Sequence, residues 1–443
     1  MSMTKKVKQQ AAVDRNRSDQ IKDNFTRRSY LKGCSAAGAT AFAGCLGGAE
    51  DDDTITVGIL EDQSGDFAIN GIPKHRATIL AIEEINENGG ILGREVEYLD
   101  PDPQSDVDRY RDLANQLILQ DQVDMLTGAF ASNTREAIRP IVNDEQQLYF
   151  YSNEYEGGLC DDTTFSIGSI PEQQYGTLIP YMVDEFGPEV YIVAADYNFG
   201  QLSAEWIRTY AEENGGEVVG EEFPPLGQSE YGSVVNRIQS EDPDFVATVM
   251  VGDAQSGFFT DAENFGLDLP MASSVNLSQS YEHIRFDSPT MENMHSAVYY
   301  MEEIDTDRND DFVDRFYDRW PDTEYINQMA MSPYVTIQLY KQAVEEAGTV
   351  DQDEVISVLE QGMDVEAPSG DLRLKGSTHH MSHNMRLARV EEDHSISILG
   401  DDVVEPSFLE EAIGCDLTQH SDTTQYSPSD VEDFSSYIRN HSF

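Results

Sequence analysis

The strongest constraint on the fold is an alternation of short β-branched runs and helical segments that begins at Thr54. Residues 54–60, TITVGIL, are typical of a buried strand. A helix is predicted over 71–88, and the Asn-Gly-Gly run at its end is a helix stop. The alternation continues with strands at 95–100, 123–128 and 147–152 and helices over 107–120 and 133–145. Such a succession predicts a parallel, doubly wound sheet.

The same alternation restarts near residue 190 and predicts a second α/β lobe. It comprises strands at 190–196, 217–223 and 244–252 and helices over 199–214, 229–240 and 254–265. Beyond it, helices are predicted at 307–320 and 324–347, followed by short polar strands near 370–375 and 385–399. No Pro- or Ser-rich linker stands between the lobes, so we expect the chain to cross between them several times.

Ligands of open α/β sheets bind beyond the carboxyl ends of the strands, so the loops after the predicted strands are the candidate site. These loops are rich in hydroxyl, amide and aromatic side chains and contain no lysine; they are EDQSGDFAING, GAFASNTRE, YSNEYEGG, ADYNFGQ, VGDAQSG and SSVNLSQS. That composition favours a small polar ligand that is not a phosphate.

The charge balance is strongly acidic, with 28 Lys and Arg against 83 Asp and Glu and a formal net charge of −55. After residue 44 the lysines are Lys74, Lys341 and Lys375. Nucleic-acid binding needs a basic patch, so a nucleic-acid partner is disfavoured. Because the acidic residues are spread along the whole chain, we favour a surface adapted to the very high salt of a halophilic organism, where screening weakens self-repulsion. The alternative is an acidic interaction surface.

Residues 1–44 are interpreted as an export signal, followed by a lipid-anchored tether at 45–53. The apolar run at 33–44 is too short to span a bilayer, which needs about 20 apolar residues. TRRSYLK at 26–32 resembles the twin-arginine export consensus, and FAGC at 42–45 resembles a lipobox. The lipobox resemblance implies a diacylglyceryl group on Cys45, and two acyl chains are what stable anchoring requires. The membrane would then be contacted through this anchor only.

The remaining cysteines form an even pair. Cys34 lies in the predicted signal and Cys45 takes the lipid, which leaves Cys160 and Cys415. In an oxidising compartment this pair is a candidate disulfide, and the alternative is two unrelated buried thiols.

The sequence lacks the common motifs of phosphate binding and nucleophilic catalysis. No Walker A loop, no GxGxxG after a strand and no GxSxG elbow is present. THHMSHN brings His379, His380 and His383 together, but their spacing is not that of HExxH, and we favour an exposed turn over a metal site. We therefore predict no metal, no cofactor and no enzymatic activity.

Six segments resemble the amide/urea-binding branch of type I periplasmic binding proteins, within the branched-chain amino-acid receptor superfamily of ABC transporters. They occur in the family's order over about residues 54–400: ITVGILEDQSGDFAI, AIEEINENGGILGREVE, GAFASNTREAIRPIV, YFYSNEYEGG, ADYNFGQ and EAPSGDLRLKGSTHHMSHNMRLARV. The resemblance implies two lobes that close on a ligand by hinge rotation, with a permease and an ATPase as partners. The expected division is lobe I at 54–168 and 296–363, lobe II at 169–295 and 364–405, and a C-terminal extension at 406–443.

The resemblance also implies the ligand-binding residues. They are Phe130 as an aromatic wall, Ser132 as a hydroxyl partner, Tyr151, Ser152 and Asn153 from the YFYSN loop, and Tyr197, Phe199 and Asp253 from the second lobe. Urea and short amides are planar N–H donors, and each buried donor left without an acceptor costs about 1–3 kcal/mol. Asp253 and the serine hydroxyls can accept from such a ligand, and the aromatic rings can enclose it.

Two departures keep other functions open. Phe130 stands where relatives often have Trp or Tyr, and Asn276 and Gln279 stand where urea-binding relatives tend to be acidic. A branched-chain or other amino-acid receptor of an ABC importer is the first alternative, since Asp253 could accept from an ammonium group. A surface-anchored hydrolase or sensor domain is the alternative of another class, and a hydrolase would require a nucleophile–base pair.

Overall fold

The computed structural model describes residues 54–441, except the side chains of Asp253, Asn276 and Ser278. The predicted signal, Cys45 and the tether lie outside the described residues. In the part of the chain that is described, no helix combines the length and apolar character needed to cross a membrane.

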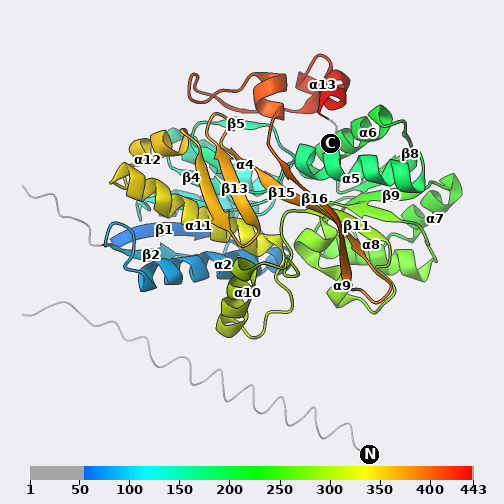
Figure 1. The fold of residues 1–443 in the computed structure, drawn as a ribbon, viewed down its shortest axis with the longest axis horizontal. Helices are drawn as coiled ribbons and strands as arrows, with labels where there is room; N and C mark the ends of the chain where they lie inside the picture. Colours follow the sequence, from blue (N-terminus) through cyan, green and yellow to red (C-terminus); the bar gives the residue numbers. More distant parts are fainter. Residues whose placement is uncertain (1–53, 442–443) are drawn as a thin grey trace, which may run out of the picture. The chain divides into compact units, whose positions relative to one another are not determined.

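The first lobe is built on a sheet with the strand order β12-β13-β14-β6-β4-β3-β1-β2 (Figure 1). Its strands are β1 (Thr54–Leu60), β2 (Glu95–Leu99), β3 (Met125–Gly128), β4 (Tyr149–Tyr151), β6 (Thr164–Ser166), β12 (Met363–Ala367), β13 (Gly370–Lys375) and β14 (His380–Met381). From β2 to β14 the neighbouring strands are parallel, as predicted. β12 and β13 are antiparallel, because only two residues join them and so short a connection makes a hairpin.

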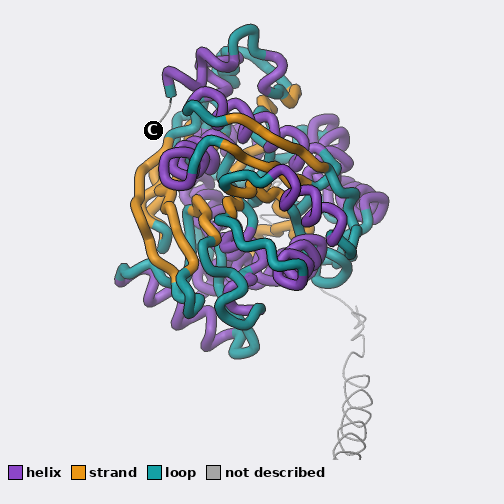
Figure 2. The backbone as a smooth tube through the Cα atoms, turned by 90° about the vertical axis from the view of Figure 1, so that its right-hand side faces the viewer, coloured by secondary structure: helices purple, strands orange, loops and turns teal. Residues whose placement is uncertain are grey.

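Helices flank the strands of this lobe (Figure 1), and the helices of the second lobe face the viewer in Figure 2. They are α2 (Ala68–Glu87), α3 (Val107–Leu119), α4 (Ser132–Asp144), α10 (Asp307–Arg319), α11 (Gln328–Ala347) and α12 (Gln352–Leu359). Val57 and Ile59 of β1 belong to the same hydrophobic cluster as Ala77 of α2, which packs against α11. The next residue, Leu60, belongs to a second cluster with Tyr110 of α3. The sheet is therefore covered on both faces, as a doubly wound fold requires.

The second lobe repeats this plan with the strand order β16-β15-β11-β10-β9-β7-β8. Its strands are β7 (Glu189–Ala194), β8 (Glu217–Glu222), β9 (Phe245–Val249), β10 (Met271–Ser273), β11 (Met294–Val298), β15 (His383–Val390) and β16 (Ile396–Val404). Its helices are α5 (Pro171–Phe186), α6 (Asn198–Glu213), α7 (Gly232–Glu241), α8 (Asp253–Asn264), α9 (Glu282–Arg285) and the π-helical turn η1 (Asn276–Ser280). β15 and β16 are antiparallel to their neighbours, whereas β7 to β11 are parallel.

The boundary between the lobes differs from the expected one. The sequence placed 364–405 in lobe II, but β12, β13 and β14 lie in the first sheet, because β14 pairs with β6 at His380 and Ser166. β11 belongs to the second sheet, although lobe I was expected to resume at residue 296. The chain thus crosses between the lobes after β6, after β11 and after β14, in keeping with the predicted absence of a single linker.

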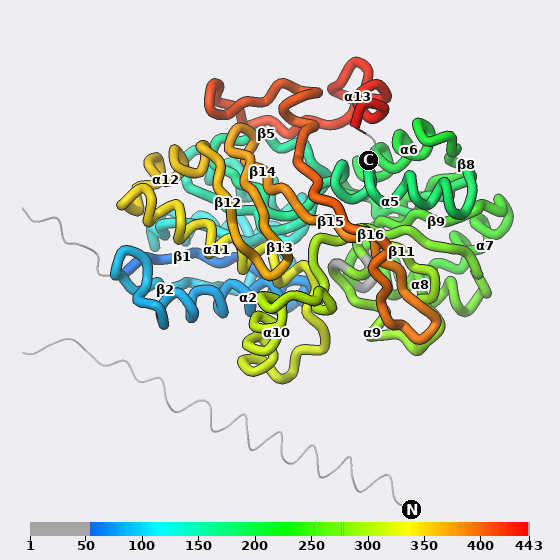
Figure 3. Tube along the Cα trace, viewed as in Figure 1, coloured from blue at the N-terminus to red at the C-terminus, as the bar shows by residue number. Residues whose placement is uncertain are grey.

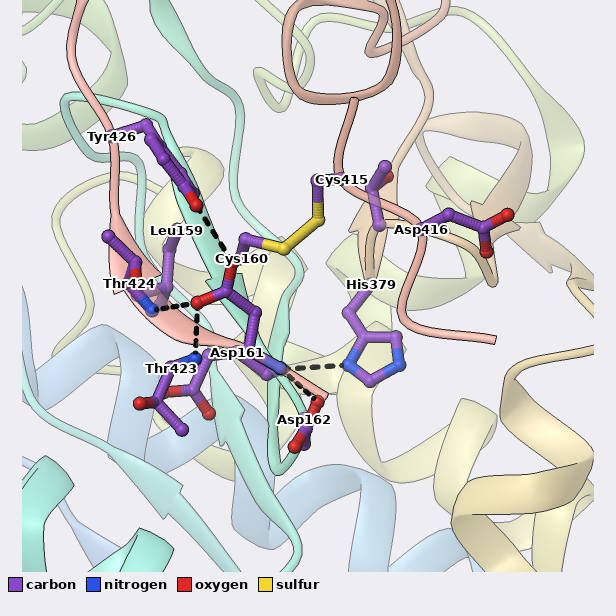
Figure 4. The surroundings of a disulfide bond; sticks show 12 residues. Leu159, Cys160, Asp161, Asp162, His379, Cys415, Asp416, Thr423, Thr424 and Tyr426 are labelled. Atoms are coloured by element: carbon purple, nitrogen blue, oxygen red, sulfur yellow. Dashed lines mark hydrogen bonds between the residues drawn. A yellow bond between two sulfur atoms is a disulfide. The ribbon is translucent and has the colours of Figure 1, made fainter. Parts of the chain in front are cut away.

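The C-terminal extension joins the first lobe through a small sheet and a disulfide (Figure 4). β17 (Thr423–Gln425) pairs antiparallel with β5 (Leu159–Asp161), so that Thr424 lies opposite Cys160. Cys160 forms a disulfide with Cys415, with their Cα atoms 6.2 Å apart and a separation of 255 positions in the sequence. The disulfide therefore fixes a late segment of the chain to an early one.

The histidine cluster is buried, which corrects the exposed turn expected from the sequence. His379, His380 and His383 are each 1 % exposed or less. His379 ends the turn before β14 and His380 begins β14 of the first sheet, whereas His383 is the first residue of β15 in the second sheet. Their rings have separate partners: His379 stacks on Phe165 at 3.9 Å and His383 on Tyr299 at 4.2 Å, between ring centroids. Among the described residues, no group of three or more His, Cys, Asp or Glu is arranged to hold a metal ion.

We predict that these buried histidines make stability fall in mild acid. Burial lowers the pKa of His380 to about 4 and that of His383 to about 3, below the ordinary value of 6.5. Below pH 6.5 the unfolded chain therefore binds more protons than the folded chain, so the free energy of unfolding decreases as the pH falls through this window. For His383 the loss should be on the order of a few kcal/mol.

The measurement is thermal denaturation at about pH 7 and about pH 4.5. His383→Asn should lower the melting temperature at neutral pH and show a smaller further decrease in acid than the wild type. His420→Asn, at an exposed histidine, is the matched control and should keep the wild-type acid response. A His383→Asn variant with the full wild-type acid response would contradict this assignment.

Candidate ligand-binding site between the lobes

Each sheet has one topological switch point, where successive connections run to opposite sides of a strand. β1 has β2 on one side and β3 on the other, and β7 lies in the same way between β8 and β9. The connections diverge at these points, and ligands of open α/β sheets bind beyond the carboxyl ends of such strands. The loops after β1 and β3 in the first lobe, and after β7 and β9 in the second, therefore form the candidate site.

The loops of the two lobes meet in the structure. Gly252, which follows β9, lies so close to the first lobe that a Cβ built on it would be 3.4 Å from a ring carbon of Phe67. Phe67 in turn packs on Phe130, with their ring centroids 4.9 Å apart. Phe130, Ala131 and Met329 form a small hydrophobic cluster against which Phe67 and Tyr197 also pack. Aromatic side chains from both lobes thus enclose one region.

A buried carboxylate beside this region joins the two lobes. Glu154, in the loop after β4, accepts hydrogen bonds from the side-chain amides of Gln174, Gln279 and Gln328, the last at 2.7 Å. Gln174 and Gln279 belong to the second lobe and Gln328 to the first. Asn327 strengthens the same link, since its amide donates to the backbone oxygen of Gln279 at 2.8 Å.

The network around Glu154 presents hydrogen-bond acceptors. The carboxamide oxygens of four of its residues are buried and have no hydrogen-bond partner within the described part of the chain: Asn70, Asn153, Gln174 and Gln279. The amide nitrogen of each of these side chains already donates to a protein oxygen. Burying an oxygen without a donor costs about 1–3 kcal/mol. The network is therefore chemically suited to a solute that brings several N–H groups.

Ser132 is held by a second buried carboxylate. Its hydroxyl donates to Glu156, which also receives the guanidinium of Arg135 at 2.8 Å and the amide of Gln425 at 2.6 Å. Burial acts to raise the pKa of Glu156, but Arg135 and the hydrogen bonds from Ser132 and Gln425 outweigh it and leave that pKa lowered. Glu156 is therefore an ionised carboxylate beside the N-terminus of helix α4.

The predicted residues of the YFYSN loop mainly support the site from behind. The Tyr151 hydroxyl and the Asn153 amide both donate to the backbone oxygen of Phe130, each at 2.8 Å, and so fix the aromatic wall. Ser152 faces away from it: its hydroxyl lies 3.5 Å from Glu61. Burial raises the pKa of Tyr151, so its hydroxyl stays protonated as a donor.

Beneath Ser152 lies a buried ion pair that the sequence did not single out. The Lys74 ammonium is 3.3 Å from Glu61 and 3.2 Å from the backbone oxygen of Ala129, which it contacts as a donor. Burial raises the pKa of Glu61 to about 8 in spite of Lys74, and burial lowers the pKa of Lys74. Ala129 has a φ of 66°, a left-handed conformation that this contact helps to hold just before Phe130.

The second-lobe residues have mixed outcomes. Tyr197 precedes α6 and packs on the Phe130 cluster, whereas Phe199 is buried in the main hydrophobic core, 6.1 Å from Tyr197 between ring centroids. The structure therefore brings Phe130, Ser132 and Tyr197 into one region and leaves Phe199 as core. Asp253 is the first residue of α8, and its side chain lies outside the described residues.

The residues that the sequence did not single out are Phe67, Glu154 and Glu156, together with Gln174 and Gln328. Gln279 was named only as a departure from urea-binding relatives. In a chain with 83 acidic residues, a single Glu in a loop carries little information. The usable signal was their position in the sequence, because Glu154 and Glu156 flank Tyr155 in a loop that follows a buried strand. Gln328 gave no such signal, since it lies far along the chain at the start of α11.

Comparison with known proteins gives one consistent result. Residues 54–395 match the family model described as periplasmic binding protein. A Leu/Ile/Val-binding protein homolog 6 of Brucella suis is 23% identical over 348 residues, which is 76% of this chain and 88% of that protein. A leucine-, isoleucine-, valine-, threonine- and alanine-binding protein of Pseudomonas aeruginosa is 21% identical, over 75% of this chain and 89% of that protein.

Solved structures show the same fold. One is a branched-chain amino acid transporter substrate binding protein of Streptococcus pneumoniae in complex with isoleucine. It has a TM-score of 0.70 and 19% identity, and the match covers 80% of this chain and 100% of that one. A solute binding protein of an ABC transporter from Rhodopseudomonas palustris in complex with benzoate has a TM-score of 0.72 and 21% identity, covering 82% and 99%. With its two lobes and its match over most of its length, the chain belongs to the periplasmic binding protein family.

Proposed function

We propose that the protein is the extracytoplasmic solute receptor of an ABC importer and that it binds urea or a short-chain amide between its lobes. Family membership supports binding rather than catalysis and makes a hydrolase the weaker alternative. A permease and an ATPase would be its partners, because a closed receptor is the form that a permease can distinguish from an open one. Cys45, outside the described residues, would carry the lipid that keeps the receptor at the membrane.

The observation that carries the choice of ligand is the Glu154 network. Its carboxylate already accepts from three primary carboxamides, the same chemical group that an amide or urea presents. Four unpartnered amide oxygens stand around it, so a ligand with several N–H groups would satisfy acceptors that the protein leaves open. Phe67, Phe130 and Tyr197 would cover the flat faces of such a ligand.

The site favours a neutral ligand over an acid. The cationic side chains near it are already paired, Arg135 with Glu156 and Lys74 with Glu61. A carboxylate ligand would meet Glu154 and the amide oxygens and would lack donors of its own to satisfy them. We therefore do not extend to this chain the benzoate that the Rhodopseudomonas palustris protein holds.

An amino-acid receptor is the second candidate, and the names of the Brucella suis and Pseudomonas aeruginosa relatives favour it. An ammonium group could be bound by Glu154. The α-carboxylate would need backbone N–H groups, and the first turn of α4 beside Ser132 supplies such groups because its N-cap makes no side-chain hydrogen bond.

We predict that calorimetric titration of the purified protein in molar KCl detects urea, acetamide or formamide with a dissociation constant on the order of micromolar. Leucine serves as the competing ligand class. Micromolar binding of leucine without binding of urea or the amides would replace the first proposal by the second. Turnover of any of these compounds would contradict a binding function altogether.

We also predict that Glu154→Gln lowers the affinity for the ligand that the wild type binds by about 10- to 100-fold. The reason is the loss of one hydrogen bond to a charged group. The substitution keeps the size of the side chain, so folding should be preserved, and circular dichroism checks this. Glu346→Gln removes the same charge at an exposed position and is the matched control. Equal affinities of the two variants would remove Glu154 from the site.

A further inference from the structure

The C-terminal segment at 406–441, here called the strap, lies across both lobes (Figures 1 and 3). It contains η2 (Leu409–Ile413), β17, the 3₁₀ turn η3 (Pro428–Asp430) and α13 (Phe434–Asn440). The match to the periplasmic binding protein family ends at residue 395, so the strap lies beyond it. Membership of the family therefore implies nothing about the contacts of the strap.

The middle of the strap is fixed to the first lobe. Cys415 is covalently bonded to Cys160, and β17 adds a strand to β5. The backbone N–H of Tyr426 donates to the oxygen of Gly158 at 2.7 Å, and the Gly158 backbone lies so close to Tyr426 that a Cβ would not fit. This attachment is both covalent and closely packed.

Both ends of the strap are fixed to the second lobe. The Trp206 ring of α6 packs against both Phe408 and Phe434, with ring centroids 5.0 Å and 4.7 Å away. Glu172, at the start of α5, accepts the backbone N–H of Phe408 at 2.8 Å and the hydroxyl of Tyr437. Because Phe408, Trp206 and Tyr437 are buried, this attachment is held by apolar contact as well as by hydrogen bonds.

The path of the strap adds two connections between the lobes. The chain leaves the second lobe at the end of β16, reaches the first lobe at Cys415, and returns to the second lobe at Phe434. Only residues 427–433 lie between the attachment of Tyr426 and that of Phe434, and part of this stretch is the compact turn η3. A chain spans at most about 3.5 Å per residue. Separation of the lobes would therefore stretch the strap or pull its aromatic residues off Trp206.

The strap also reaches the wall of the candidate ligand site. Gln425 of β17 donates to Glu156 at 2.6 Å and accepts from Arg135 at 2.9 Å. Glu156 is the acceptor that holds the hydroxyl of Ser132. The first-lobe attachment of the strap is thus continuous with the residues that line the site.

We propose that the strap restrains the opening of the two lobes, so that the ligand-free receptor stays close to the closed arrangement. When most of the ligand-free receptor is already closed, less of the binding free energy is needed to close it than in a receptor that is mostly open. The disulfide and the contacts on Trp206 are the two attachments that set this restraint. It does not depend on which solute the site binds.

The test is small-angle X-ray scattering of the ligand-free, full-length protein in molar KCl. The wild type should keep the radius of gyration of the closed arrangement. Cys160→Ser with Cys415→Ser releases the first-lobe attachment, and Phe434→Ala weakens the second-lobe attachment. Each should increase the radius of gyration while the far-ultraviolet circular dichroism stays that of a folded protein. Glu432→Ala, at an exposed position of the strap, is the control and should scatter as the wild type does.

Both results of this experiment are informative. If the double-serine variant or Phe434→Ala is folded and keeps the wild-type radius of gyration, the proposal is wrong. If the double-serine variant does not fold, the test is the comparison of the radius of gyration of Phe434→Ala with that of Glu432→Ala. Because no ligand is added, a failure here leaves the ligand assignment untouched. A failure of urea or amide binding likewise leaves the strap untouched.

Discussion

The buried carboxylate of Glu154 is the interaction on which the arrangement of the two lobes depends. It lies where the lobes meet, and its amide partners come from both of them. A carboxylate removed from water is stable only when donors surround it, so the closed arrangement and the hydrogen bonds of Glu154 require one another. In the proposed function, the carboxylate that joins the two lobes is also the group that the ligand contacts.

The hydrogen-bond network around Glu154 and the attachments of the strap join the lobes by different kinds of interaction. Hydrogen bonds between neutral amides and a carboxylate can be exchanged for those of a ligand or of water with little net change in free energy. A disulfide and the aromatic contacts on Trp206 cannot be exchanged in this way. The molecule thus combines an interface that a ligand can reorganise with a restraint that stays in place. That combination suits a receptor that must close reversibly around a small solute.

The residues of the candidate site were only partly predictable. Phe130 and Tyr197 follow strands in recognisable loops, and the structure places them together. Phe199 has the same signal but packs into the core, because it stands two residues after Tyr197 at the start of α6, and residues two apart on a helix do not face the same way. Helix α5 was not among the predicted helices. It contains two prolines, and Pro171 occupies its first turn, where a proline is tolerated.

What the sequence determined by itself is the architecture: two α/β lobes with parallel sheets, several crossings and ligand loops at the strand ends. Those features depend on local periodicity, which a linear chain displays directly. Only the tertiary structure decided the partners of Glu154, the burial of the three histidines, the position of β12 to β14 in the first sheet, and the attachment of the strap to both lobes. Apart from the Cys160–Cys415 pair, which the cysteine count had made a candidate disulfide, these are contacts between residues tens to hundreds of positions apart that composition and spacing do not record.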